Sequence, residues 1–313
     1  MAKRIWLVAL VTLIFGFLSV AGAVAQGSII AWGDNWGSGV PEPNAGFVAV
    51  AGGSHHSLGL KSDGSVVGWQ DDGGCGVPLP NTGFVAVAAG GEMGLCLKSD
   101  GSIVVWGEDC GGNHNVPEPN TGFVAVAAGA ELLLVGLKSD GSIVVSGGSH
   151  CWPPPDPNTG SVAIAAGGSH CLALKSDGSV VAWGDGYYGD CDVPEPNTGF
   201  VAISAGFYHN LALKSDGSVV AWGDNSKGQC NVPEPNSGFV AISAGRAHSL
   251  GLKSDGSVVA WGFNYWGQCD VPEPNTGFVA ISAGYLYSLG ITEAGPTATE
   301  PSTWGSIKAE LGK

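Results

Sequence analysis

The sequence predicts an all-β protein built from repeats, because short motifs return at a nearly constant spacing and no segment between them has helical periodicity. The motif K-S-D-G-S recurs in steps of 37, 40, 37, 39 and 39 residues. A fixed period of this size is typical of solenoids and propellers. The lysines of its copies are Lys61, Lys98, Lys138, Lys175, Lys214 and Lys253.

Two further markers bring the number of repeats to seven. The motif F-V-A-[VI]-[AS] begins at Phe47, Phe84, Phe123, Phe200, Phe239 and Phe278, with Ser161 as a degenerate seventh. A tryptophan marker, which lies in the run V-A-W-G in three repeats, occurs at Trp32, Trp69, Trp106, Trp183, Trp222 and Trp261, and Ser146 takes its place in the fourth repeat.

Each repeat contains four short strand candidates, rich in β-branched residues and bounded by Gly, Pro and Asn. They are S-V-V-A-W-G, a brief segment around G-Q-C-N-V, F-V-A-I-S-A-G and H-S-L-G-L-K. Asp-Gly between two apolar runs favours a type I′ hairpin turn, so we interpret the repeated Asp as a turn residue. Seven such repeats predict a seven-bladed β-propeller of four-stranded antiparallel blades.

The two ends of the repeat region are complementary. Gly27 to Trp32 resembles the second half of a D-G-S hairpin, and Tyr287 to Ile291 resembles the first half. We therefore expect the N- and C-terminal strands to pair and close the ring, which an open solenoid would not require.

Four segments are expected along the chain. Residues 1–25 have a basic start, an apolar run and an A-x-A site, as a secretory signal peptide does, with an uncleaved membrane anchor as the alternative. Residues 26–293 form the propeller, and residues 294–303 form a polar linker. The tail, residues 304–313, is either a disordered end or a sorting or docking tag.

Charge narrows the choice of partner. The formal net charge of −15 becomes −17 when Lys3 and Arg4 leave with the signal peptide, and no basic patch remains. Nucleic acids are therefore not expected to bind. We expect a secreted or cell-surface monomer with no membrane span after signal cleavage.

Three motifs resemble the regulator of chromosome condensation repeat: W-G-D-N-S-K-G-Q at Trp222, A-G-R-A-H-S-L at Ala244, and K-S-D-G-S. The resemblance implies a seven-bladed propeller, although the fourth repeat departs from the pattern at Ser146 and at Pro153-Pro154-Pro155. The family's founder is a nucleotide-exchange factor that binds chromatin. Another relative is a secreted bacterial inhibitor of β-lactamases that grips the enzyme with the loops of one face. The second relative matches the expected compartment, but no individual residue carries over.

Histidines recur five residues before the K-S-D-G-S lysine. They are interpreted as imidazoles packed and bonded to nearby backbone, with a metal-binding ring as the alternative. Met93 and Leu133 occupy the same position and cannot bind zinc, so no metal site is expected. The histidines are His56, His170, His209 and His248.

Eight cysteines in a secreted chain suggest disulfides. Four share one repeat position and are expected to be buried thiols, namely Cys75, Cys191, Cys230 and Cys269. Four others break the repeat pattern and are the disulfide candidates, namely Cys96, Cys110, Cys151 and Cys171.

Catalytic motifs are missing from the sequence, which has no G-x-S-x-G, H-E-x-x-H or P-loop pattern. We therefore expect no catalytic residue, no cofactor and no enzyme activity. The recurrent glutamates lie in P-E-P-N turns, and their repetition indicates a scaffold role; they are Glu42, Glu118, Glu195, Glu234 and Glu273.

The loops after the tryptophan marker and after A-G differ between repeats and are rich in aromatic residues. In a blade of four antiparallel strands these two loop sets leave the same face, and the monotonous K-S-D-G-S and V-P-E-P-N loops leave the other. Tyr, Trp and Arg dominate interface hot spots, although rings that only cover blade edges are the alternative. The candidate partner-binding residues are Trp36, Trp152, Tyr187, Tyr188, Phe207, Tyr208, Arg246, Tyr265, Trp266 and Tyr285.

These features predict a secreted, non-catalytic scaffold that recognises an extracellular protein or glycan with its aromatic loops. A structural cell-surface component is the first alternative, and an enzyme with an unrecognised site is the weaker one.

Overall fold

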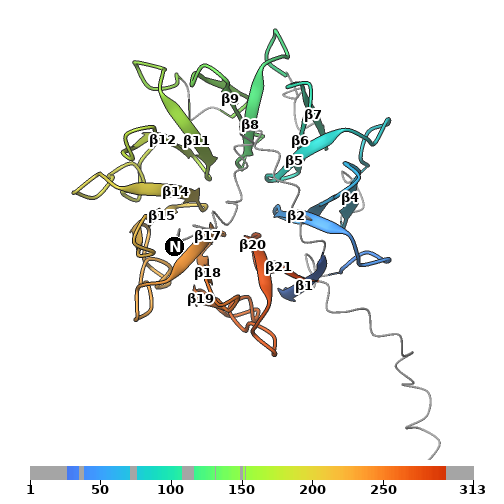
Figure 1. The fold of residues 1–313 in the computed structure, drawn as a ribbon. Helices are drawn as coiled ribbons and strands as arrows, with labels where there is room; N and C mark the ends of the chain where they lie inside the picture. The colour runs from blue at the N-terminus through green and yellow to red at the C-terminus, as the bar shows by residue number, and fades with distance from the viewer. Residues whose placement is uncertain are drawn as a thin grey trace, which may run out of the picture.

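Every element of the described residues is a β-strand, and the strands form sheets that radiate from a common centre in the computed structural model (Figure 1). The structure describes residues 27–34, 39–70, 76–107, 116–130, 132–148, 151 and 153–293. The predicted signal peptide, linker and tail lie outside these residues. Within them, no helix is long and apolar enough to span a membrane.

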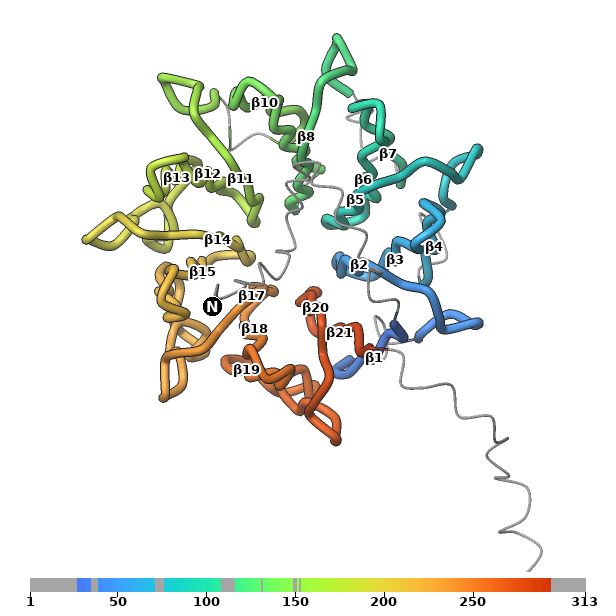
Figure 2. Tube along the Cα trace, viewed as in Figure 1, coloured from blue at the N-terminus to red at the C-terminus, as the bar shows by residue number. Residues whose placement is uncertain are grey.

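The strands repeat in threes along the chain. The first strand of each group lies nearest the centre, as the tube in Figure 2 shows; these are β2 (Phe47–Gly52), β5 (Phe84–Ala89), β8 (Phe123–Ala128), β11 (Ser161–Ala166), β14 (Phe200–Ala205), β17 (Phe239–Ala244) and β20 (Phe278–Ala283). The middle strands are β3 (Ser57–Lys61), β6 (Met93–Lys98), β9 (Leu134–Lys138), β12 (His170–Lys175), β15 (His209–Lys214), β18 (His248–Lys253) and β21 (Tyr287–Glu293). The outer strands are β1 (Gly27–Gly33), β4 (Val66–Trp69), β7 (Ile103–Gly107), β10 (Ile143–Ser146), β13 (Val180–Gly184), β16 (Val219–Gly223) and β19 (Val258–Gly262).

Each group is an antiparallel sheet with the middle strand bonded to both neighbours, for example β17-β18-β19. The inner strand has a β-bulge after its first residue, between Phe239 and Ala241 in β17. The ring of that phenylalanine covers Gly251 in β18, where an added Cβ would lie only 2.4 Å from the ring. The motif F-V-A therefore anchors the sheet through packing as well as through strand propensity.

The predicted fourth strand is not observed, and each group has three strands. The pairing of Gly27 in β1 with Phe47 in β2 joins two of these groups into one six-stranded sheet. In the loop after β16, side-chain oxygens accept hydrogen bonds from backbone N–H groups that a fourth strand would need for pairing. Cys230 N donates to Asn225 Oδ1 at 3.0 Å, and Lys227 N donates to Gln229 Oε1 at 2.9 Å. The segment therefore forms a pair of turns.

An asparagine side chain occupies the edge that the fourth strand would cover. Asn236 Oδ1 accepts from Val219 N at 2.8 Å, and Asn236 Nδ2 donates to Val219 O at 2.9 Å. The same two bonds join the other P-x-P-N or P-N asparagines to their outer strands: Asn44 to Ile29, Asn81 to Val66, Asn120 to Ile103, Asn158 to Ile143, Asn197 to Val180 and Asn275 to Val258.

The hairpin at K-S-D-G-S is confirmed, but its turn is not type I′. In the copy at Lys214 only the glycine has a positive φ, which is 83° at Gly217. Lys214 N donates to Ser218 O at 2.8 Å, so the loop has three residues and glycine at the left-handed position. Asp216 Oδ1 accepts from both the Ser218 backbone and its hydroxyl, which holds this longer loop together.

The hydrophobic core lies between neighbouring sheets. One cluster joins Leu250 of β18 to Ile281 of β20 and Trp32 of β1. Leu250 and Ile281 are completely buried, and each such side chain contributes about 1.5–3 kcal/mol. Each sheet is therefore stabilised by its neighbours, as repeat architectures require.

The predicted pairing of the chain ends is observed. Strand β1 pairs with β21 from Gly27↔Glu293 to Gly33↔Tyr287 and so becomes the outer strand of the group that begins with β20. This group also contacts β2, where Gly52 N donates to Ser282 Oγ at 3.0 Å. The Tyr287 hydroxyl donates to His56 O at 2.7 Å.

Candidate functional site

The loops after the tryptophan marker and the loops after A-G lie together on one side of the molecule, here called the variable face. Asp224 N, after Trp222, donates to Tyr208 O, after Gly206, at 2.8 Å. Phe263 N donates to Ala247 O at 2.9 Å in the next sheet. The predicted grouping of loops therefore holds with three strands, because the outer strand ends beside the start of the middle strand.

The K-S-D-G-S and P-E-P-N loops lie at the other ends of the strands, here called the uniform face. Ser215 N donates to Gly199 O at 3.2 Å, and Phe239 N donates to Gly217 O at 3.0 Å. These loops are nearly identical from one repeat to the next.

Five predicted residues form a continuous aromatic and cationic row on the variable face. Tyr188 and Tyr208 have ring centroids 4.3 Å apart, and Phe207 meets Tyr208 edge-on at 4.5 Å. Phe207 also contacts Tyr285 at 6.0 Å. The Arg246 guanidinium carbon lies 4.6 Å from the Tyr285 ring centroid.

A second aromatic group lies after β19. Tyr265 meets Trp266 edge-on at 5.1 Å and stacks with Phe263 at 6.4 Å. Phe263 is absent from the predicted set. The sequence could have identified it, because the residue after W-G is an aspartate in other repeats (Asp34, Asp185 and Asp224) and a phenylalanine here. Lys227 Nζ lies 6.0 Å from the Phe263 ring and adds a second cation to this face.

The predicted residues differ in exposure. Tyr187 and Tyr265 are 82% and 77% exposed, and Tyr188 and Trp266 are 51% and 48% exposed. Arg246 is exposed, whereas Phe207, Tyr208 and Tyr285 are half-buried. Trp36 and Trp152 lie outside the described residues, so their placement stays a prediction.

A central channel opens on the variable face. A cavity of about 270 Å³ is lined by Val, Ala, Ile and Ser of the inner strands, and a smaller one of about 80 Å³ forms its mouth. Glycine and alanine backbone lines most of the mouth, together with Phe207, Arg246 and Tyr285. The row of aromatic residues therefore ends at the channel.

Backbone hydrogen bonds between sheets narrow this mouth. Phe207 N donates to Gly245 O, and Tyr285 N donates to Gly53 O, each at 3.1 Å. Glycine is required for this approach, because a Cβ on Gly206 would lie 2.5 Å from both Gly245 O and the His209 ring.

The histidines of the repeat position are buried and packed, as expected. The Nε2 atoms of His170, His209 and His248 contact side chains of the next sheet. His209 Nε2 contacts Ser249 Oγ at 2.9 Å, and His248 Nε2 contacts Ser288 Oγ at 3.0 Å. Among the described residues, no group of three His, Cys, Asp or Glu side chains is arranged to hold a metal ion.

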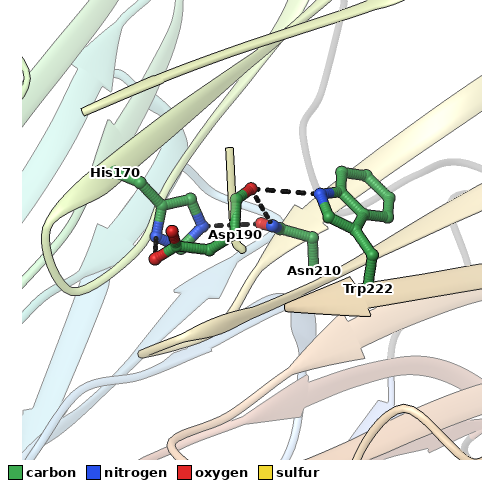
Figure 3. Close-up of polar contacts among 4 residues, drawn as sticks. All are labelled: His170, Asp190, Asn210 and Trp222. Carbon is green, nitrogen blue, oxygen red and sulfur yellow. Dashed lines mark hydrogen bonds and ion pairs between the residues drawn. The ribbon is translucent and has the colours of Figure 1, made fainter. Parts of the chain in front are cut away.

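One histidine faces a buried carboxylate (Figure 3). His170 Nε2 contacts Asn210 Oδ1 at 2.6 Å, and Asp190 Oδ2 lies 3.2 Å from His170 Nδ1. Asn210 Nδ2 and Trp222 Nε1 both donate to Asp190 O, at 2.7 and 3.0 Å. Glutamine takes the place of Asp190 in the two following repeats. All four residues hold two sheets together, and their burial argues for a structural role.

The cysteine predictions are partly wrong. Cys96, Cys151 and Cys171 are buried free thiols, so the predicted disulfides are not present among them. Each lies in an apolar cluster between sheets, and burial raises the pKa of Cys96 above its ordinary value. Cys191, Cys230 and Cys269 are free thiols as expected, but only half-buried. Cys75 and Cys110 lie outside the described residues.

Comparison with known sequences identifies the repeat. Residues 162–190, 200–229 and 239–268 match the Regulator of chromosome condensation (RCC1) repeat. The predicted resemblance is therefore confirmed for these three segments. No curated protein matches the sequence of the chain.

Solved structures share the fold. Prp20p from Saccharomyces cerevisiae is 18% identical, with a TM-score of 0.72 over 88% of this chain and 93% of Prp20p. The ectodomain of the Physcomitrella patens receptor kinase CR4 is 22% identical, with a TM-score of 0.64 over 80% of this chain and 71% of the ectodomain. Human WBSCR16 is 15% identical, with a TM-score of 0.65 over 86% and 99%. The chain thus has the fold of an RCC1-type β-propeller, and at these identities the likeness extends to the fold alone.

Proposed function

We propose that this protein is a secreted, non-catalytic binding scaffold, a closed seven-bladed ring that recognises an extracellular protein or glycan with its variable face. The threefold grouping of the strands and the pairing of β1 with β21 support the ring. The signal-like residues 1–25 support secretion.

One observation carries the binding function: four large aromatic side chains about half exposed or more gather on the face whose loops differ between repeats. They are Tyr187, Tyr188, Tyr265 and Trp266. Exposed aromatic groups of this kind mark interaction sites, and Tyr, Trp and Arg supply most hot-spot energy. Prp20p, which has the same fold, is described as binding Gsp1p and histones, so this architecture supports protein recognition in that relative.

The test begins with capture of a partner from native culture medium, followed by titration of two panels of variants. In the first panel, Tyr188→Ala, Arg246→Ala, Tyr265→Ala and Trp266→Ala are each expected to weaken binding by about 1 kcal/mol or more where the residue is a hot spot. Their melting temperatures are expected to stay near that of the wild type, because exposed loop substitutions cost little stability.

The second panel is the control on the uniform face. Glu195→Gln, Glu234→Gln and Glu273→Gln keep an oxygen that can accept from Asn197, Asn236 and Asn275 N, as the glutamates do at 3.0–3.1 Å. These variants are expected to bind normally. Loss of binding in this panel, with binding kept in the aromatic panel, would contradict the proposal. Recovery of the protein only with cell-envelope material would favour a structural role instead.

A further inference from the structure

The cations of this acidic chain are divided unequally between its two faces. The described lysines of K-S-D-G-S lie at the uniform face, where several cover phenylalanine rings and donate to backbone oxygens, as Lys253 does to Pro235 O at 3.0 Å. Only Lys227 and Arg246 are described cations of the variable face. Arg246 and Arg4 are the only arginines in the sequence.

Arg246 lies at the channel mouth without an anionic partner among the described residues. Its guanidinium stacks on Tyr285 at 4.6 Å and is exposed to solvent. The other residues around the mouth are Gly, Ala, Ser and Phe207, none of which carries a charge. Stacking covers a face of the guanidinium and leaves its N–H donors available in the ring plane, where they match a carboxylate.

The size of the mouth limits what can enter it. Pockets for small molecules usually measure about 300–1,000 Å³, whereas the mouth measures about 80 Å³. This space suits the end of one side chain. The walls beneath are mostly Val, Ala and Ile side chains. The Ser204 and Ser243 hydroxyls already accept from Ala244 N and Ala283 N at 3.0 and 2.9 Å.

We propose that the mouth beside Arg246 receives the carboxylate of one Asp or Glu side chain from a protein partner, with apolar residues on either side of it that contact Tyr188, Phe207 and Tyr285. This inference rests on the proposed binding function and specifies the partner's chemistry. The net charge of −15 disfavours a partner that is acidic throughout, so a single carboxylate in an apolar setting is required.

The probes are the peptides acetyl-Leu-Glu-Leu-amide and acetyl-Leu-Gln-Leu-amide, titrated into full-length protein labelled with ¹⁵N-arginine. The Arg246 Nε–H signal is assigned by its loss in Arg246→Gln. We expect a saturable shift of this signal with the Glu peptide at millimolar concentration and roughly tenfold weaker binding of the Gln peptide, because bonds between ionised groups are the stronger ones. Binding to variants is followed on the peptide signals.

Lys214→Gln is the matched control, since Lys214 Nζ also lies over an aromatic ring, 5.3 Å from Phe200, but on the uniform face. It is expected to keep the preference for the Glu peptide, and Arg246→Gln is expected to lose it. Equal binding of the two peptides, no saturable shift, or equal losses in both variants would overturn the inference. Preferential, Arg246-dependent binding of trigalacturonate would assign the mouth to an acidic glycan and overturn the protein assignment.

The carboxylate site and the proposed binding function can be tested separately. A captured partner that depends on Tyr265 and Trp266 but not on Arg246 would leave the binding function standing and remove the carboxylate site.

Discussion

At the scale of single residues, the buried histidines show how a side chain joins two sheets. Ser249 Oγ donates to Gln229 O at 2.8 Å, so it must accept from His209 Nε2, which therefore carries the proton. His209 Nδ1 is buried without a hydrogen-bond partner among the described residues. Burial lowers the pKa of His209 to about 3, with a further contribution from His248 and His170, and burial lowers the pKa of His248 to about 4.

These histidines predict a loss of stability in mild acid. In the unfolded chain they take up protons below pH 6.5, whereas in the folded protein they stay neutral until about pH 4 for His248 and about pH 3 for His209. Stability is therefore complete above pH 6.5 and falls by up to about 1.4 kcal/mol per pH unit for each histidine below it. Urea unfolding at pH 7 and pH 5 is expected to differ by roughly 2 kcal/mol per histidine.

The variant His209→Asn is expected to be less stable at pH 7. The difference in its unfolding free energy between pH 7 and pH 5 is expected to be smaller by the contribution of one histidine. His55→Asn serves as the control because His55 is exposed. An unchanged pH dependence in His209→Asn would contradict the assignment of this effect to the buried ring.

At the scale of elements, an asparagine replaces a strand. Asn236 offers Val219 one acceptor and one donor, which are the two bonds that a neighbouring strand residue would make. The free edge of β16 is therefore hydrogen-bonded at Val219, and the segment before Asn236 forms turns instead of a strand.

Asn236→Ala is expected to destabilise the protein by about 1–3 kcal/mol, since it leaves the N–H and C=O of Val219 without their partner. Chemical denaturation measures the change. Ser237→Ala, at the neighbouring exposed residue, is expected to cost less than about 0.5 kcal/mol. Equal costs for the two variants would show that the asparagine bonds contribute nothing to stability.

At the scale of the whole molecule, the two chain ends form one sheet. Strand β1 contributes Ile29 and Trp32, which are 2% and 6% exposed, to the core around β21 and β20. Trp32 Nε1 donates to Gln268 O at 3.0 Å, the bond that Trp261 makes to Gln229 O in the preceding group. The group made from both ends thus repeats the tryptophan bond of a group made from one continuous segment.

Deletion of residues 27–33 is expected to lower the melting temperature by on the order of 15 °C. The deletion removes the core side chains of Ile29 and Trp32 and leaves one edge of β21 unpaired. Deletion of residues 296–313, which lie in the predicted linker and tail, is the comparison and is expected to have little effect. Differential scanning calorimetry of the two truncated proteins measures both. Equal melting temperatures would mean that the pairing of β1 with β21 contributes no stability.

The sequence alone determined the features whose causes are local. The three strands and the D-G turn depend on residues a few positions apart. The period and the complementary chain ends follow from the repetition of these local motifs along the chain. The grouping of aromatic loops on one face also followed, because it depends only on the alternation of antiparallel strands. The fourth strand and the type I′ turn were wrong, since side-chain bonds from Asn225, Asn236 and Asp216 compete with the backbone pattern.

Only the tertiary structure decided which residues meet across sheets. His170 contacts Asn210, and His209 contacts Ser249. Each partner lies in the next repeat, 40 residues along the chain, and the packing of the sheets brings the two side chains together. The same packing buries Cys151 beside Cys171 and places Arg246 over Tyr285 at the channel mouth. These contacts depend on the distance and angle between sheets, which the spacing of motifs within one repeat does not specify.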